Sequence, residues 1–181
     1  ARGTVLIVHG LGEHIGRYEH VAAQLLRCGR NVVGYDQRGH GESAGKRGRL
    51  NRPNDLLHDL AVVIDAVRAR HPGPLVLLGH SMGGLVAARM VAGGLESPPP
   101  AWHRKVDALV LSSPALDAGL GGAQKAQLKV MGWLAPNLAV GNGLKPGWIS
   151  RDPAVVEAYT NDARVHDRVT PKLVRFIVDG S

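Results

Sequence analysis

A serine flanked by glycines is the residue in this chain that is best placed to do chemistry. Residues 79–83 read Gly-His-Ser-Met-Gly, directly after an apolar run at 75–78 and before apolar residues at helical spacing. A G-x-S-x-G sequence between a strand and a helix predicts a nucleophile elbow, a sharp turn that exposes the serine. The helix would direct its free N–H groups, including that of Met82, toward a reacting oxygen. Ser81 is therefore the candidate nucleophile.

Strands that alternate with helices are expected to position this turn. Apolar runs predict buried strands, and repeats at i, i+3, i+4 and i+7 predict helices between them. The strands are expected at 4–8, 31–35, 75–78 and 106–111, and the helices at 18–26, 53–67 and 82–93. This order indicates right-handed crossovers and a parallel sheet. The glycine-rich turn at 9–12 and the basic loop at 36–51 would then lie with Ser81 at the carboxyl edge.

The pattern changes after residue 112. Helices are expected at 123–134, 153–159 and 171–178, with no convincing buried strand among them. Such an insertion over the carboxyl edge is typical of a lid. Its apolar residues either line a lipid-sized entrance or hold the lid helices to the domain, and they are Leu128, Met131, Trp133, Leu134, Leu138, Leu144 and Trp148.

Four ordered motifs carry a resemblance to a known family. They are His-Gly-Leu-Gly-Glu-His at 9–14, Tyr-Asp-Gln-Arg-Gly-His-Gly-Glu-Ser at 35–43, Gly-His-Ser-Met-Gly-Gly at 79–84 and Ser-Ser-Pro-Ala at 112–115. Together they resemble monoacylglycerol lipases and related lysophospholipases of the α/β-hydrolase fold. The resemblance implies a parallel sheet flanked by helices, with a core at 1–114 and a helical lid at 115–181 after the fourth strand.

The resemblance also implies a set of site residues. Ser81 would be the nucleophile, and the backbone N–H groups of Leu11 and Met82 would form the oxyanion hole. Gly10, Leu11, His80 and Met82 would contact the substrate. Preorganised donors of this kind are each worth roughly 3 to 4 kcal/mol in the transition state.

The catalytic base and its acid are not expected within this chain. In the family they follow two further strands after the lid, so the chain is expected to be an internal piece of a longer hydrolase, with an incomplete sheet and negligible turnover alone. The histidines present are assigned other roles. His9, His14 and His40 are expected to fix loops, His80 to pack beneath the elbow, His103 to lie at the far end of the sheet, and His166 to belong to a lid motif.

One pair of charges in the second motif is expected to stabilise a loop. Asp36 and Arg38 lie in a tight glycine-rich segment and are predicted to clamp its turn against the histidine loop at 9–14. A solvent-exposed ion pair is the alternative.

Composition excludes several other classes. The net charge is +7, but the one dense basic cluster, Lys46, Arg47, Arg49 and Arg52, has no interleaved aromatic residues, which argues against nucleic-acid binding. Cys28 is the single cysteine, so neither an intrachain disulfide nor a cysteine-based metal site is expected, and no cofactor is implied. No segment has the length of a bilayer span or the pattern of a signal peptide, which favours a soluble cytoplasmic protein.

Three functional hypotheses follow. The first is a serine hydrolase that cleaves a monoacylglycerol or lysophospholipid through an acyl-enzyme, with transient contact between the lid and a membrane surface. The second keeps Ser81 but cleaves a peptide or carbon–carbon bond, because a fold does not fix the substrate. The third is a non-catalytic binding module with a lidded pocket. Acyl-chain length, head group and oligomeric state stay open.

Overall fold

Four parallel strands form the centre of the molecule. The computed structural model describes residues 2–117, 119 and 121–180. The sheet has the order β2-β1-β3-β4, with β1 at Thr4–Val8, β2 at Asn31–Gly34, β3 at Leu75–His80 and β4 at Ala108–Ser112. All four predicted strands are present, and each begins within two residues of its predicted first residue. In this register Val8 lies opposite Gly79, and His80 opposite Ser112, so the loops after three strands meet at one edge.

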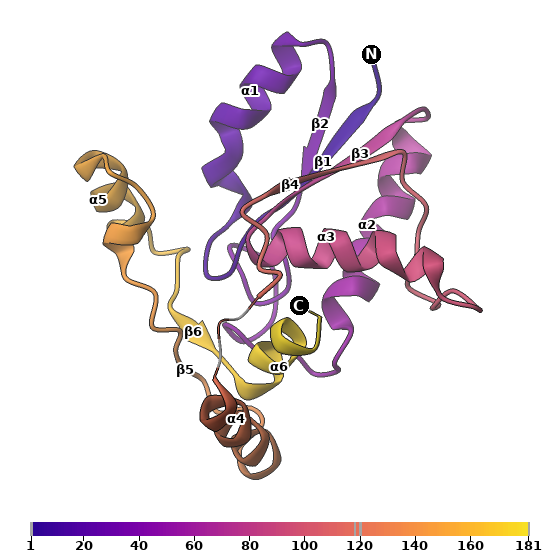
Figure 1. The fold of residues 1–181 in the computed structure, drawn as a ribbon. Helices are drawn as coiled ribbons and strands as arrows, with labels where there is room; N and C mark the ends of the chain where they lie inside the picture. Colours follow the sequence, from indigo (N-terminus) through magenta and orange to yellow (C-terminus); the bar gives the residue numbers. More distant parts are fainter. Residues whose placement is uncertain (1, 118, 120, 181) are drawn as a thin grey trace.

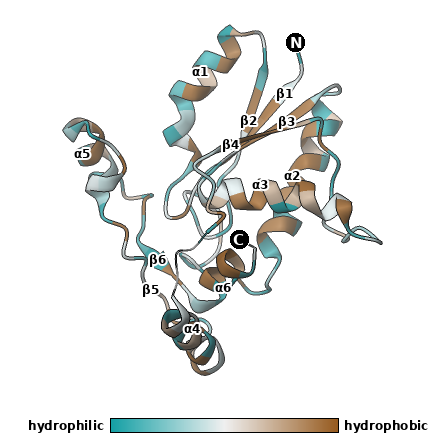
Figure 2. Cartoon of the chain, in the orientation of Figure 1, coloured by the Kyte–Doolittle hydropathy of each residue, from teal (hydrophilic) through white to brown (hydrophobic). Residues whose placement is uncertain are grey.

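Helices cover both faces of the sheet (Figure 1), and the main buried apolar cluster lies on one of these faces. The helix α1 (Glu19–Arg27), entered through the short η1 (Ile15–Tyr18), lies on one face. On the other face lie α2 (Asp55–Arg70) and α3 (Met82–Ala92), the latter followed by η2 (Gly93–Leu95). Figure 2 shows hydrophobic residues along the strands and along α2 and α3, and the buried cluster that these elements form includes the fully buried Leu6, Leu60, Leu77 and Leu85.

Two predicted elements are less buried than their sequences indicate. The strand β4 was expected to be buried, yet Val110 is 48% and Leu111 37% exposed. It is an edge strand, and a uniformly apolar run does not distinguish an edge from a central position. The helix α1 has no fully buried residue, and Leu26 at its end is 57% exposed. Its amphipathic pattern correctly predicts the helix but not the depth of its packing.

The predicted lid region, residues 115–181, contains the three expected helices, which are α4 (Gly122–Leu134), α5 (Pro153–Asn161) and α6 (Pro171–Gly180). It also has the 3-10 turn η3 (Pro146–Trp148) and an antiparallel pair that sequence did not predict, β5 (Val140–Gly141) with β6 (Arg168–Val169). Strands of two residues are too short to show a period. Figure 1 shows α4 beside α6, and α5 on a separate arm.

The last helix is joined to the core. Leu173 and Phe176 of α6 are buried in the same apolar cluster as the residues of α3. Thr170, just before α6, donates from its backbone and its hydroxyl to the Gly48 carbonyl of the basic loop. The division between core and lid at residues 114 and 115 stays a prediction. Among the described residues, no helix has both the length and the apolar character needed to cross a membrane.

Candidate active site

Ser81 occupies a strained turn between β3 and α3. Its backbone has φ 52° and ψ −122°, a conformation that residues with a side chain rarely adopt. Such strain costs on the order of 1–3 kcal/mol and persists only where the surroundings hold it. Here the Ser81 N–H donates to the Ser112 carbonyl (3.0 Å), and its own carbonyl accepts from Leu85 (3.1 Å) and Ala115 (3.0 Å). The turn has the geometry that the G-x-S-x-G pattern predicts.

Glycines allow three backbone segments to meet at this turn. A Cβ on Gly83 would lie 2.2 Å from the Val8 carbonyl oxygen and 2.3 Å from that of His9, both in or next to β1. A Cβ on Gly10 would lie 3.2 Å from the Cβ of Ser81. The β1 loop, which we define as residues 9–14, therefore packs directly against the elbow because neither glycine carries a side chain.

A cavity of about 650 Å³ opens over Ser81. One part of its wall is polar, with Glu13, Arg17, Tyr18 and Tyr159, and another is apolar, with Val21, Leu144, Trp148 and Ile149. Gly10, Leu11 and His80 also line the cavity. The resemblance predicts that these three residues contact the substrate. The Met82 side chain does not line the cavity, because it is 1% exposed and packs in the core. Met82 could therefore reach a ligand only through its backbone.

Two backbone donors beside the cavity have no protein acceptor. Within the described residues, neither the Leu11 N–H nor the Met82 N–H donates a hydrogen bond to another protein group. Leu11 lines the cavity with Ser81, and Met82 is the first residue of α3. The positive end of the α3 dipole lies at the same point. These groups are suited to hold a negatively charged oxygen.

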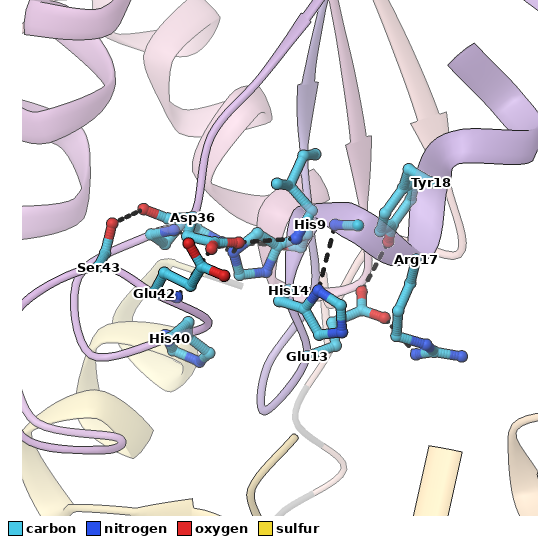
Figure 3. A network of polar contacts seen from close by, with 12 residues as sticks. His9, Glu13, His14, Arg17, Tyr18, Asp36, His40, Glu42 and Ser43 are labelled. Carbon is cyan, nitrogen blue, oxygen red and sulfur yellow. Dashed lines mark hydrogen bonds and ion pairs between the residues drawn. The ribbon is translucent and has the colours of Figure 1, made fainter. Parts of the chain in front are cut away.

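The carboxylate of Glu13 holds the β1 loop in place through hydrogen bonds (Figure 3). One oxygen accepts from the Gly10 N–H and the Tyr18 hydroxyl, both at 2.6 Å, and the other accepts from the Arg17 guanidinium. Burial, together with the Glu13 charge, raises the pKa of Tyr18 far above its usual range, so its hydroxyl stays a donor. Sequence reasoning did not single out Glu13, although it is the fifth residue of the first motif.

The histidines of the first two motifs are structural, as expected. His9 is fully buried, accepts from the Gln37 N–H at Nε2 (2.9 Å) and donates from Nδ1 to the Gly10 carbonyl (2.8 Å). His40 donates from Nδ1 to the Arg38 carbonyl (3.0 Å). Burial lowers the pKa of His40 to about 3 and also lowers that of His9, so both rings are neutral near pH 7.

The prediction that Asp36 clamps its loop to the histidine loop is confirmed. The same prediction for Arg38 is wrong, because Arg38 binds residues of α2 instead. Asp36 accepts from the Ile15 N–H (2.8 Å) after the β1 loop and from the Glu42 N–H (2.9 Å), so it clamps the two loops together (Figure 3). Arg38 points the other way and forms ion pairs with Asp55 and Asp59 of α2. Sequence spacing did not indicate that α2 passes beneath this loop.

Three further histidines, His80, His103 and His166, form hydrogen bonds with groups other than the Ser81 hydroxyl. Nδ1 of His80 is 3.1 Å from the Ser112 hydroxyl, and its ring lines the cavity rather than packing beneath the elbow. His103 bonds the Met90 carbonyl (2.8 Å), before β4 and away from the carboxyl edge, as predicted. His166 lies against the His40 ring, with centroids 4.7 Å apart. In the described part of the chain, no histidine nitrogen is hydrogen-bonded to the Ser81 hydroxyl.

Most of the seven apolar residues that were expected to line or hold the predicted lid are exposed and do not pack against the core. Trp133 is 83%, Leu134 63% and Leu138 51% exposed, whereas Leu128 and Met131 are half-buried. Leu144 and Trp148 line the cavity over Ser81. The lining role therefore applies to Leu144 and Trp148, which are themselves largely exposed, and none of the seven residues belongs to the buried apolar cluster of the core.

Comparison with known proteins places this arrangement in a family. The family model described as serine aminopeptidase S33, a Hydrolase_4 model, matches residues 1–181. The chain belongs to this family of α/β-hydrolases. It is 40% identical over 173 residues to a monoacylglycerol lipase of Mycolicibacterium smegmatis, covering 94% of this chain and 59% of that protein. It is 32% identical over 165 residues to human monoglyceride lipase, covering 89% and 52%.

Solved structures agree with the family assignment. The crystal structure of a monoacylglycerol lipase from Paleococcus ferrophilus superposes with a TM-score of 0.80 at 37% identity, covering 99% of this chain and 65% of that one. The fold class and the resemblance inferred from the four motifs are therefore confirmed. The chain spans between half and two thirds of the length of these family members.

Proposed function

We propose that this protein is a serine ester hydrolase that cleaves a monoacylglycerol or lysophospholipid through an acyl-enzyme on Ser81. The observation that carries the proposal is the position of Ser81 in a strained turn, beneath a half-apolar cavity and beside two unpaired backbone donors. The names of the relatives, which include monoacylglycerol lipases and a phospholipase, support the substrate class. Because the chain spans only part of their length, this activity is proposed for the whole protein.

The reaction would proceed in two steps. The Ser81 Oγ attacks the acyl carbonyl carbon, its proton passes to a base, and the carbonyl oxygen becomes an oxyanion held by Leu11 and Met82 N–H groups. The alcohol leaves with a proton, and water then attacks the acyl-enzyme to release the fatty acid. We propose that the histidine base and its acid come from outside residues 1–181, so that this piece alone has negligible turnover.

A peptidase is the second candidate, because the family description names an aminopeptidase. An aminopeptidase must bind the α-ammonium group of its substrate, for which a free carboxylate is the natural partner. Among the described residues that line the cavity, the one carboxylate is that of Glu13. It already accepts three hydrogen bonds, one of them from Arg17. An ester with an apolar chain and no α-ammonium group suits this cavity better.

A substrate panel and a covalent probe test the proposal together. The full-length protein is expected to hydrolyse p-nitrophenyl esters, to leave aminoacyl p-nitroanilides intact, and to bind a fluorophosphonate at Ser81, as mapped by peptide mass spectrometry. Cleavage of the anilides in preference to the esters would favour the peptidase. Binding of a monoacylglycerol without turnover and without a phosphonyl adduct would favour the non-catalytic module.

We further propose that the exposed apolar residues of the lid contact a lipid surface, from which the substrate enters. Trp133, Leu134 and Leu138 face outward on or near α4, and aromatic residues are favoured at membrane interfaces. Trp133→Asp is expected to lower co-sedimentation with phosphatidylcholine vesicles severalfold. Leu95→Asp is the matched control, because Leu95 is 90% exposed but is the last residue of η2, outside the predicted lid. Equal losses in both variants would argue against a lid-specific contact.

A further inference from the structure

A segment of the lid lies directly on the β1 loop. We call residues 159–166 the strap; they run from the end of α5 toward β6. The His166 N–H donates to the Gly12 carbonyl (2.8 Å), and His14 bonds the carboxylate of Asp162 (2.7 Å). These contacts join two parts of the chain that no strand pairing connects. Both contacts lie just after Leu11, whose N–H is one of the two proposed oxyanion donors.

The hydrogen bond between His14 and Asp162 involves a buried imidazole whose proton position is defined by a second hydrogen bond. His14 is 2% exposed, and its Nδ1 accepts from the Gly16 N–H (3.2 Å), so the ring proton lies on Nε2 and is donated to Asp162. Hydrogen bonds from the Arg164 side chain and backbone, and from His14, hold the pKa of the Asp162 carboxyl well below its usual range. The acceptor is therefore charged throughout the neutral pH range.

The backbone contact at Gly12 is equally close. Gly12 has φ +75°, and a Cβ there would lie 2.2 Å from the His166 carbonyl oxygen. Loop and strap can approach this closely only because residue 12 is a glycine. The ring of His166 also contacts the ring of His40 at an interplanar angle of 44°, and His40 belongs to the loop that borders the β1 loop.

A further contact reaches the other end of the loop. The guanidinium of Arg17 lies 4.6 Å from the centroid of the Tyr159 ring, the first residue of the strap. Arg17 binds Glu13, and Glu13 accepts from the Gly10 N–H. The strap is thus connected to both sides of Leu11, through Gly10 on one side and through Gly12 and His14 on the other.

We infer that the strap positions the proposed oxyanion donor, with Asp162 and His166 acting as positioning residues through His14 and Gly12. The inference rests on the proposed function and extends it. Asp162, His166, His14 and Gly12 do not line the cavity, so they act on the β1 loop and not on the substrate. An oxyanion donor works only if it is held at the correct distance before the reaction begins. A displaced Leu11 N–H would slow acylation without weakening ground-state binding.

The kinetic test uses the full-length protein and a p-nitrophenyl ester. Asp162→Ala is expected to lower kcat about tenfold, with KM within about twofold of the wild type, because only the transition state uses the donor. Asp162→Asn keeps an oxygen acceptor for His14 and should recover most of kcat. Asp167→Ala is the matched control, since that exposed carboxylate pairs with Arg168 just beyond the strap. An unchanged kcat in Asp162→Ala, or no recovery in Asp162→Asn, would overturn the inference.

A double-mutant cycle and hydrogen exchange complete the test. His14→Ala should lower kcat to the same level as Asp162→Ala and as the double variant; additive losses would contradict a shared mechanism. Hydrogen–deuterium exchange in peptides covering residues 9–16 should rise in Asp162→Ala and not in Asp167→Ala. This measurement does not need activity. If Ser81→Ala retained hydrolysis, the proposed function would fail, while the exchange result would still decide whether the strap holds the loop.

Discussion

Ser81→Ala is expected to lower kcat/KM for ester hydrolysis by a factor of at least about 10³ in the full-length protein. Removal of the nucleophile leaves only the residual effect of binding and of the oxyanion donors. The backbone at Ser81 has φ 52°, which strains serine and alanine alike. Because alanine adds no strain and is smaller, the variant should keep the fold. Initial rates with a medium-chain monoacylglycerol, read by fatty-acid release, give the comparison.

The control for this variant is Ser97→Ala. Ser97 is exposed after η2 and is not among the residues that line the cavity, so its replacement should leave the rate within about twofold. A Ser81→Ala protein that kept a tenth or more of the wild-type rate would exclude the acyl-enzyme route. The intact mass after brief exposure to a fluorophosphonate should rise in the wild type and not in Ser81→Ala.

Gly83→Ala is expected to destabilise the protein by more than about 4 kcal/mol, or to prevent folding. Its methyl group would lie 2.2 Å from the carbonyl oxygen of Val8, the last residue of the central strand β1, and 2.3 Å from that of His9, which also accepts a hydrogen bond from Gln37. Relief of the clash would require α3 to separate from β1, which would also displace the elbow. Urea denaturation followed by circular dichroism measures the loss.

The matched substitution is Gly132→Ala. Gly132 lies inside α4, and a Cβ there would meet nothing within 4 Å. Alanine should stabilise this helix, by up to about 1 kcal/mol, because glycine is a poor helix former. If both variants had the stability of the wild type, the close packing of α3 on β1 would be wrong.

The parts of the fold that sequence predicts well are those with a local signal. The strand at 4–8 and the helix after Ser81 follow from apolar runs and spacing, and the elbow follows from its glycines. The exposure of β4 has no local signal, because a uniformly apolar run is the same at the edge and in the centre of a sheet; within residues 1–181 this strand ends the order β2-β1-β3-β4, in agreement with the incomplete sheet that the resemblance implies. The partners of Arg38 were missed for the same reason: Asp55 and Asp59 are distant in sequence, on a helix whose direction the loop does not reveal.

The candidate site was predicted only in its chemically distinctive part. Ser81, Gly10, Leu11 and His80 do come together around one cavity, as the motifs indicate. Glu13 was missed because a single glutamate in a loop has no periodic signal, although its network holds Gly10. Asp162 was missed because nothing local marks it as the partner of His14.

The hydrogen bond between His14 and Asp162 has a consequence for the order of folding. It joins residues that are 148 positions apart in the chain, whereas the hydrogen bonds that hold the Ser81 turn reach only as far as Ser112 and Ala115. Closing a long loop costs chain entropy, so contacts of this kind form after local ones. During synthesis the serine turn can form early, whereas the donor loop beside it waits for residues 159–166. We therefore expect the Ser81 turn to be held once Ala115 has been synthesised, before the contacts of residues 159–166 fix the neighbouring Leu11 N–H.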